Sequence, residues 1–230
     1  MPVIDYEAKV QSLYEKVLRK GDNCIDVGAH QGRHMFPMAR LVSPGGKVYG
    51  FEPIPSMFEA LRAEVTKRGV GAAVQLSPFA ASFEDGESEF VVALDSPGYS
   101  GLKERTYDIP TRLERIRVQM RRLDGVLGEL QKLRFIKIDV EGGEWGVIRG
   151  ATELVTRLRP VVAFEFGMNS YSKYGVDPGE VYDFFASRRY GIRDILGDPM
   201  RDRQHFVDSS RVQTVWDYAA IPTETTLTGW

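Results

Sequence analysis

Short apolar stretches that end at glycine or at an acidic residue alternate along this chain with segments whose apolar residues recur every three or four positions. This alternation is typical of strands and helices that follow one another in an α/β protein with a mostly parallel sheet. The expected elements, in chain order, are a helix within residues 1–20, strands over 23–27 and 47–52, helices over 34–42 and 55–68, a strand over 73–76, a helix over 124–131, a strand over 135–140, a helix over 145–157, a strand over 160–166, a helix over 178–188, and closing strands over 190–196 and 212–220.

Between the third and fourth core strands the alternation breaks down. Residues 80–83, 87–94 and 117–123 are typical of extended segments, so an insertion over 80–123 replaces a helix. Its middle, 96–112, contains glycines, prolines and charges without periodicity, which predicts a long loop that could act as a lid. Because nothing indicates a second domain, we expect one domain over 1–230.

The first strand runs into a turn with the pattern D-x-G-x-x-x-G, formed by Asp26, Gly28 and Gly32. The glycines allow a positive φ or a close approach of the backbone to a ligand. The second strand ends at another acid, Glu52. In open α/β sheets a ligand binds outside the carboxyl ends of the strands, and an acid at the end of the second strand typically holds a ribose. The pattern therefore predicts a cofactor that contains adenosine.

The spacing of the turn bears on which cofactor binds. A dinucleotide fingerprint needs G-x-G-x-x-G, whereas His30 stands here in place of the middle glycine. Asp26 would repel a pyrophosphate but could accept a hydrogen bond from an ammonium group. S-adenosyl-L-methionine carries an ammonium and a sulfonium and has no phosphate, so the turn favours it over NAD. An NAD-dependent oxidoreductase and a cofactor-binding module without catalysis stay as alternatives.

Four motifs then give the chain a resemblance to a known family. They are D-V-G-A-H-Q-G at 26–32, G-F-E-P at 50–53, K-I-D-V-E-G-G-E at 137–144 and L-R-P-V-V-A-F-E at 158–165. In this order they resemble the FkbM-type S-adenosyl-L-methionine-dependent methyltransferases. The resemblance implies a Rossmann-like class I methyltransferase fold: a mostly parallel seven-stranded sheet with an antiparallel closing strand, helices on both faces and the β-rich insertion. It also implies O-methylation of a small metabolite such as a sugar or a polyketide hydroxyl.

The same resemblance implies roles for the residues that would bind the cofactor. Asp26, with the backbone of the two glycines, would hold the methionine portion. Glu52 would accept hydrogen bonds from both ribose hydroxyls, and small residues after the third strand would admit the adenine ring. The full set of expected cofactor-binding residues is Asp26, Gly28, His30, Gly32, Glu52, Pro53, Ala80, Ala81 and Asp139.

The fourth core strand ends in a cluster of acids, Asp139, Glu141 and Glu144. Acids this close raise one another's pKa and need protons or a cation to share, which the cofactor's positive charges could supply. We expect Asp139 at the transfer site and Glu141 as the base that takes a proton from the acceptor. Glu144 could instead cap the helix that follows. His34 is a further candidate base, because imidazole titrates near neutral pH.

Other residues near these strand ends leave alternatives open. Asp139, Glu165 and Asn169 could together hold Mg²⁺, but the motif context resembles a family other than the catechol-type enzymes, so we expect no metal. Ser100 stands where the family has a serine-rich loop. Three aromatic residues could line an acceptor pocket or simply pack in the core: Tyr171, Tyr174 and Trp216.

Composition narrows the range of partners. The chain has 230 residues, a net charge of −2 and one cysteine, Cys24, which favours a core residue over a nucleophile. Acidic and basic residues are mixed along the chain, so the sequence shows no extended basic patch of the kind that binds nucleic acid or an anionic membrane. The basic run 112–122 is an exception, but it is more typical of a solvated face. No apolar run approaches the ~20 residues that span a bilayer. We therefore expect a cytoplasmic protein that acts on a small-molecule acceptor.

Overall fold

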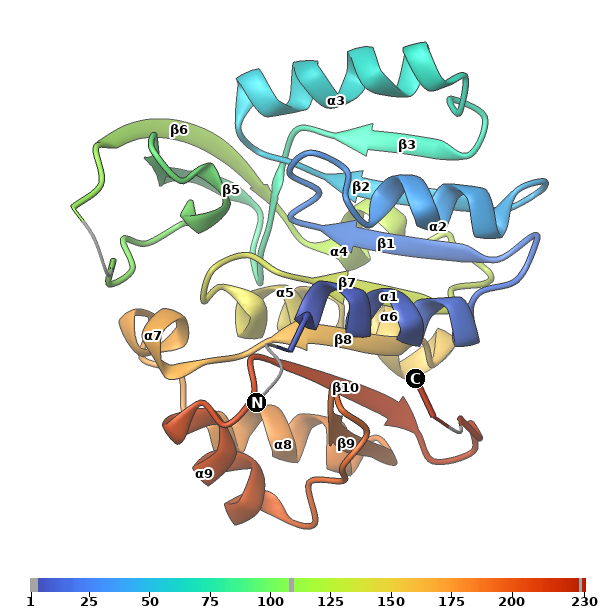
Figure 1. Cartoon of the computed structure of the whole chain (residues 1–230), viewed down its shortest axis with the longest axis vertical. Coiled ribbons are helices and arrows are strands. Elements are labelled where there is room, and N and C mark those ends of the chain that lie inside the picture. Colours follow the sequence, from blue (N-terminus) through green and yellow to red (C-terminus); the bar gives the residue numbers. More distant parts are fainter. Residues whose placement is uncertain (1–3, 108–109, 228) are drawn as a thin grey trace.

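The computed structural model describes residues 4–107, 110–227 and 229–230. Its main sheet has seven strands in the order β3-β2-β1-β7-β8-β10-β9, and β10 is antiparallel to both of its neighbours. This arrangement, seen edge to edge in Figure 1, confirms the predicted mostly parallel sheet with an antiparallel closing strand. The strands are β1 Asn23–Val27, β2 Lys47–Phe51, β3 Val74–Ser77, β7 Phe135–Ile138, β8 Val161–Glu165, β9 Tyr190–Asp194 and β10 Asp217–Pro222.

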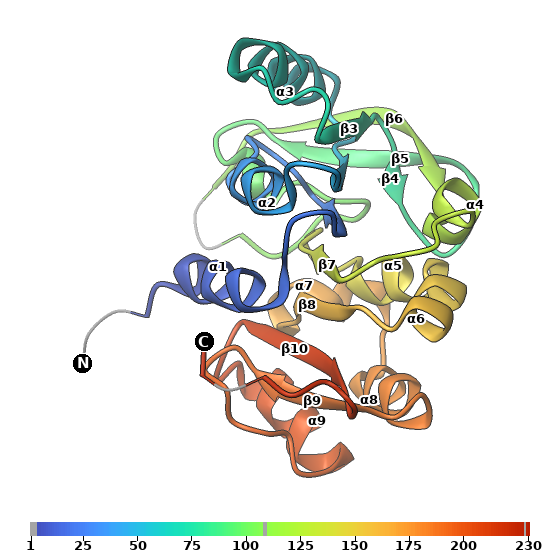
Figure 2. The same cartoon turned by 90° about the vertical axis from the view of Figure 1, so that its right-hand side faces the viewer.

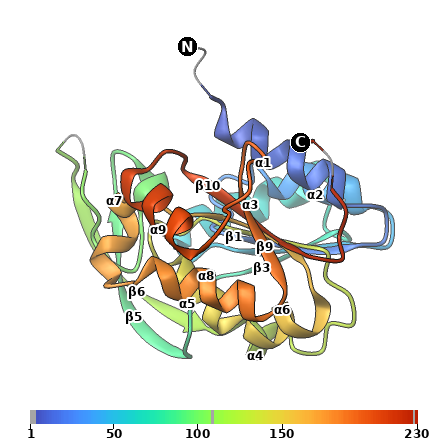
Figure 3. The same cartoon turned by 90° about the horizontal axis from the view of Figure 1, so that it is seen from below.

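Helices cover both faces of this sheet. Figures 2 and 3 show α1 and α2 on one side and α4, α5, α6 and α8 on the other. The helices are α1 Tyr6–Val17, α2 Met35–Val42, α3 Pro55–Arg68, α4 Leu123–Leu127, α5 Glu144–Gly150, α6 Thr152–Leu158, α7 Met168–Tyr171, α8 Pro178–Ser187 and α9 Arg203–Val212. Of the helices in these described ranges, none combines the length and the apolar character that crossing a bilayer requires.

The central strands lie in the core because most of their side chains are apolar and face it on both sides of the sheet. In β1 every residue from Cys24 to Val27 is buried, and in β7 every residue is buried. Phe164 of β8 stacks on Phe185 and Tyr218 at ring distances of 5.6 and 6.0 Å, so one aromatic cluster joins β8 to α8 and β10. The free thiol of Cys24 is fully buried in the other core cluster, as its place in an apolar strand predicted.

The insertion folds as a second, three-stranded sheet. It contains β4 Ala80–Ala81, β5 Gly86–Ala93 and β6 Leu113–Arg121, in the order β4-β6-β5. Between β5 and β6 the chain makes a 3-10 turn at Pro97–Tyr99 and returns to pair Gly101 with Val91. Figures 1 and 3 show β5, β6 and α7 at the same end of the molecule, the end to which the parallel strands point. The predicted β-rich insertion is confirmed.

Several stretches differ from the sequence-based expectation: the short helix α7 was not predicted, the helix expected over 124–131 ends at Leu127, and β6 begins at Leu113 rather than at 117. Two further differences are larger. The helix expected over 145–157 is split into α5 and α6, because Asp124 caps a new helix start by accepting from the backbone N–H of Glu153 and of Leu154 at 3.0 and 2.9 Å. The strand expected from 212 begins only at Asp217. Before it lies α9, which the periodicity did not reveal and which Asp202 caps by accepting from His205 N–H at 2.8 Å.

Helix α5 packs closely against the backbone that follows β4 in the insertion. A Cβ on Gly150 would lie 2.0 Å from the carbonyl oxygen of Ser82, so we expect Gly150→Ala to lower the free energy of unfolding by about 1–3 kcal/mol. Gly146 in the same helix has its nearest neighbour at 3.6 Å, and Gly146→Ala should raise stability by up to about 1 kcal/mol. Urea denaturation of both variants checks this, and equal effects would contradict the close crossing.

Candidate active site

A cavity of about 370 Å³ is lined by residues from the carboxyl ends of β1, β2 and β7 and from the insertion. Most of the residues expected to bind the cofactor or to act in catalysis line it, although they come from four separate segments. Those that line it are Asp26, Gly28, His30, His34, Glu52, Pro53, Ala80, Ala81, Asp139 and Glu141. Gly32 is not among the lining residues; it packs against Phe36 and Leu61 behind the turn.

Gly28 and Gly32 stand where a side chain would clash with neighbouring atoms. Gly28 has φ 80°, and a Cβ on it would lie 1.9 Å from the carbonyl oxygen of Asp139, so β1 and β7 can approach only with glycine there. The N–H of Gly28 donates to Phe51 O at 3.1 Å, and the N–H of Gly32 donates to Ala29 O at 2.7 Å. Both N–H donors are therefore used inside the protein, and a role of these glycines in cofactor binding stays a prediction.

Glu52 is fixed at the end of β2 by two backbone donors. Its side chain is 3% exposed and accepts from His30 N–H and Ile54 N–H, each at 2.9 Å. Burial raises the pKa of this carboxyl. Each carboxylate oxygen can accept a second hydrogen bond, so Glu52 keeps capacity for hydroxyl donors in the cavity.

A buried lysine, to which the sequence analysis gave no role, joins the two acidic strand ends. Lys137 Nζ lies 3.1 Å from Asp139 Oδ2 and 3.9 Å from Asp26 Oδ1. Burial alone would lower the pKa of Lys137, but the carboxylates of Asp139 and Asp26 raise it. The one signal in the sequence was a lysine inside an otherwise apolar strand, a position that a charged side chain occupies only when it is paired.

Three polar atoms around the first turn are buried without a hydrogen-bond partner in the described part of the chain. They are Asp26 Oδ1, His30 Nε2 and His34 Nδ1, all on residues that line the cavity. Leaving such a group unpaired costs about 1–3 kcal/mol, so the turn is suited to a ligand that brings both donors and acceptors. His30 also has φ 46°, a strained conformation for a residue with a side chain and one that is concentrated at functional sites.

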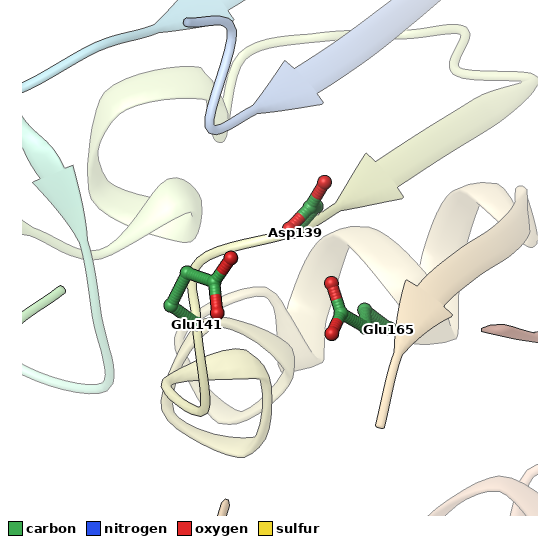
Figure 4. A group of neighbouring side chains, drawn as sticks. All are labelled: Asp139, Glu141 and Glu165. Atoms are coloured by element: carbon green, nitrogen blue, oxygen red, sulfur yellow. The ribbon is translucent and has the colours of Figure 1, made fainter. Parts of the chain in front are cut away.

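Asp139, Glu141 and Glu165 converge at the rim of the cavity, as Figure 4 shows. One carboxylate oxygen of each lies within 4.8 Å of the others. Burial, and then the charge of Asp139, raises the pKa of Glu141 to about 8 and that of Glu165 well above its ordinary value. Such spacing could hold a divalent cation. Asn169, which the sequence grouped with Asp139 and Glu165, is exposed instead.

The insertion supplies a cation to this cluster that sequence reasoning missed. Arg105 forms an ion pair with Glu141, and the two side chains are only 10% and 7% exposed. The guanidinium also stacks on the ring of Tyr99 at 4.5 Å. Glu141 has φ 58°, so a left-handed backbone turns its side chain toward the cavity and the insertion. With Arg105 on Glu141 and Lys137 on Asp139, two of the three acids already have a positive partner.

Glu144 has a different role from the cap considered above. It is the first residue of α5, and its Oε1 accepts from Val140 N–H at 2.9 Å and from Gly142 N–H at 3.1 Å. It therefore closes the turn that carries Glu141. Burial raises the pKa of Glu144 to about 7.

The aromatic candidates lie elsewhere. Tyr171, Tyr174 and Trp216 are not among the residues that line the cavity; Tyr171 stacks on Phe166 at 4.4 Å in the core. The hydroxyl of Tyr174 accepts from Lys103 N–H at 3.0 Å and so ties the insertion to the segment after α7. Ser100 does line the cavity, where its Oγ accepts from Ala93 N–H at 3.0 Å.

Known proteins are similar to this chain in sequence and in fold. Residues 26–192 match the Methyltransferase FkbM domain, and the chain belongs to that family of S-adenosyl-L-methionine-dependent methyltransferases. The membership predicted from the four motifs is thereby confirmed, as is the expected cofactor, S-adenosyl-L-methionine.

Three relatives illustrate the likeness. The 31-O-demethyl-FK506 methyltransferase FkbM of Streptomyces tacrolimicus is 33% identical over 174 residues, which is 64% of this chain and 66% of that protein. The structure of methyltransferase FkbM from Methylobacillus flagellatus KT has a TM-score of 0.54 at 14% identity, over 95% of this chain and 55% of that one. The structure of the O-methyltransferase TomG of Streptomyces achromogenes, solved with S-adenosyl-L-methionine, has a TM-score of 0.51 at 14% identity. That alignment covers 96% of this chain and 81% of TomG. This chain thus spans about two thirds or less of the first two proteins.

The buried acids make stability depend on pH in a defined direction. The pKa of Glu144 is raised by burial from 4.5 to about 7, so its contribution to stability is complete below pH 4.5 and is lost as pH rises through 7, by up to about 3 kcal/mol. We expect Tm to fall between pH 5 and 8.5. Glu144→Gln keeps an oxygen for both backbone donors but cannot ionise, so it should flatten this decline.

Scanning calorimetry across that pH range measures the effect. The exposed Glu129→Gln serves as a matched control and should leave the profile of the wild type unchanged. An unchanged slope in Glu144→Gln would show that Glu144 ionises as freely in the folded protein as in the unfolded chain.

Proposed function

We propose that this chain is an S-adenosyl-L-methionine-dependent methyltransferase that methylates an oxygen of a small metabolite, such as a sugar or polyketide hydroxyl. The observation that carries the proposal is the charge of the cavity. Its lining holds six carboxylates, those of Glu7, Asp26, Glu52, Asp139, Glu141 and Glu165. Apart from the two histidines, the positive side chains in the lining are Arg33 and Lys137. An acidic cavity favours a cationic ligand and repels a pyrophosphate, which disfavours the NAD alternative.

The unpaired atoms of the first turn fit the amino-acid end of this cofactor. Asp26 Oδ1 can accept from an ammonium group, and the free ring nitrogens of His30 and His34 can meet the neighbouring polar groups. Glu52 has accepting capacity for the ribose hydroxyls, with Pro53 beside it. Ala80 and Ala81 of β4 line the cavity, and their small side chains would admit the flat adenine ring.

When bound, the cofactor supplies a methyl group on a positively charged sulfonium. The protein's contribution is then to position the acceptor, to exclude water and to take up a proton. Tyr99 and Leu102 of the insertion line the cavity and shield it from solvent. The carboxylate of Glu141 accepts the proton of the acceptor hydroxyl, and Asp139, held by Lys137, orients the reacting groups. A pKa of about 8 for Glu141 suits a base that works near neutral pH.

The proposed cofactor site is tested by ligand binding. S-adenosylhomocysteine should raise the melting temperature, because a ligand that binds only the folded state stabilises it by about 2.7 kcal/mol at a hundredfold excess over Kd. NAD should have no effect. Glu52→Gln should weaken S-adenosylhomocysteine at least tenfold, since hydrogen bonds to a charged group contribute about 1.5–3 kcal/mol.

The exposed Glu59→Gln on α3 is the matched control and should bind as the wild type does. Calorimetric titration measures the Kd of S-adenosylhomocysteine for both variants. Stabilisation by NAD together with no response to S-adenosylhomocysteine would exclude the methyltransferase proposal.

Catalysis is tested separately from binding, after turnover against a panel of hydroxylated metabolites has identified an acceptor. Glu141→Gln should lower kcat by about 10²–10⁴-fold and remove the rise of kcat through pH 8, while the Kd for S-adenosylhomocysteine changes little. Asp26→Asn should do the reverse. A fall in kcat of less than about tenfold would mean that Glu141 is not the base. A panel without any turnover would support a module that binds the cofactor without catalysis.

A further inference from the structure

Residues 99–105 of the insertion, which we call the strap, lie against the turn after β7 that carries Glu141 (Figure 4). Gly101 is fixed to β5, because its N–H donates to Val91 O at 3.1 Å and its carbonyl accepts from Val91 N–H at 2.8 Å. A Cβ on Gly101 would lie 3.5 Å from both the Cβ and the carbonyl oxygen of Glu141. The backbone of the strap therefore packs directly on the turn, and Tyr99 of the strap lines the cavity.

Tyr174, in the segment after α7, contacts both the strap and the turn. Its hydroxyl accepts from Lys103 N–H at 3.0 Å, and the Lys103 ammonium lies 5.3 Å from the centre of its ring. The same ring packs against Gly142, where a Cβ would lie 2.7 Å from Tyr174 Cε2. One aromatic side chain thus holds the strap beside the residue that follows Glu141.

Arg105, also in the strap, contacts the carboxyl group of Glu141 itself. Both side chains of this pair are buried, and the guanidinium is kept in place by stacking on Tyr99. Arg105 Nη1 donates to Glu141 Oε2, so Oε1 keeps its capacity to accept from a hydroxyl in the cavity. Glu141 also has φ 58°, a conformation that a residue with a side chain holds only where its surroundings fix it. The strap therefore fixes one oxygen of the carboxyl group and leaves the other for an acceptor.

We propose that Arg105 is a positioning residue for the base Glu141, and that it orients Glu141 for proton transfer only while the strap lies on the turn. The inference rests on the proposed function, in which Glu141 takes the proton of the acceptor, and deepens it by giving that base a partner from the insertion. The acceptor enters while the strap is lifted. Closure of the strap then aligns Glu141 with the acceptor hydroxyl and excludes water from the cavity.

A double-mutant cycle on kcat, measured with an acceptor from the panel of hydroxylated metabolites, separates positioning from a merely structural role. Arg105→Gln should lower kcat about tenfold or more and change the Kd of S-adenosylhomocysteine less than about twofold. In Glu141→Gln, which already lacks the base, the same substitution should change the residual kcat less than about twofold, because Arg105 acts through Glu141. Arg105→Lys keeps a positive donor and should recover most of kcat. Arg117→Gln, at an exposed position of β6, should match the wild type.

Hydrogen–deuterium exchange followed by mass spectrometry measures opening of the strap and needs no acceptor. Tyr174→Phe removes the group that accepts from Lys103 N–H without changing a charge, so exchange over 99–105 should become about threefold faster or more. The same variant should lower kcat, though less than Arg105→Gln does, because Arg105 is still present but is held less firmly. Unchanged exchange in β1 and β7 reports that each variant is folded.

Failure of this inference and failure of the proposed function give different results. An unchanged kcat in Arg105→Gln, or an equal loss from that substitution with and without Glu141, would overturn the positioning role. Unchanged exchange of the strap in Tyr174→Phe, or faster exchange with a kcat equal to that of the wild type, would overturn the dependence on the strap. A wild-type protein that methylates no acceptor, or a Glu141→Gln variant with nearly full kcat, would instead overturn the proposed function and this inference with it.

Discussion

A single buried ammonium group, that of Lys137, allows the acidic strand ends to meet. Lys137 stands directly opposite Asp26 in the β1–β7 register, and its Nζ reaches Asp139, which lies two residues further along and directly after the end of β7. Removing one partner from a buried ion pair typically costs 3–5 kcal/mol, so these three side chains stabilise the arrangement only as a set. The set still carries one negative charge in excess. That excess, together with Glu52, Glu141 and Glu165, makes the cavity a site for a cation.

Parts of the chain that are distant in sequence complete this site. Glu7 comes from the amino-terminal helix, and Arg105 comes from the insertion between β5 and β6. Each pairs with one residue of a strand-end turn, Glu7 with His34 and Arg105 with Glu141. The fold supplies the acidic centre, and these two peripheral contacts orient the groups around it. The two turns are therefore held by different segments of the chain.

The sequence predicted the parts of the site that depend on local chemistry. Strand, turn and acid follow one another within a few residues at Asp26 and at Glu52, so both the fold and these positions could be predicted. Neither Glu7 nor Arg105 has such a local signature, since each acquires its role only through a partner 27 or 36 residues away. The split between α5 and α6 was not predicted for the same reason, because the residue that caps the start of α6 is Asp124, about 30 residues earlier in the sequence. Helix α9 was missed because its apolar positions are few.

If the buried carboxyl groups at the strand ends bind a cationic ligand, binding must release protons from them. Glu141 lines the cavity, and burial raises its pKa to about 8, so this carboxyl is largely protonated at pH 7. A bound cation favours its ionised form. Titration calorimetry with S-adenosyl-L-methionine at pH 7, repeated in buffers of different ionisation enthalpy, should therefore show net proton release, whereas uncharged 5′-methylthioadenosine should show little. Proton uptake, or the same result for both ligands, would show that these carboxyl groups do not interact with the positive charge of the cofactor.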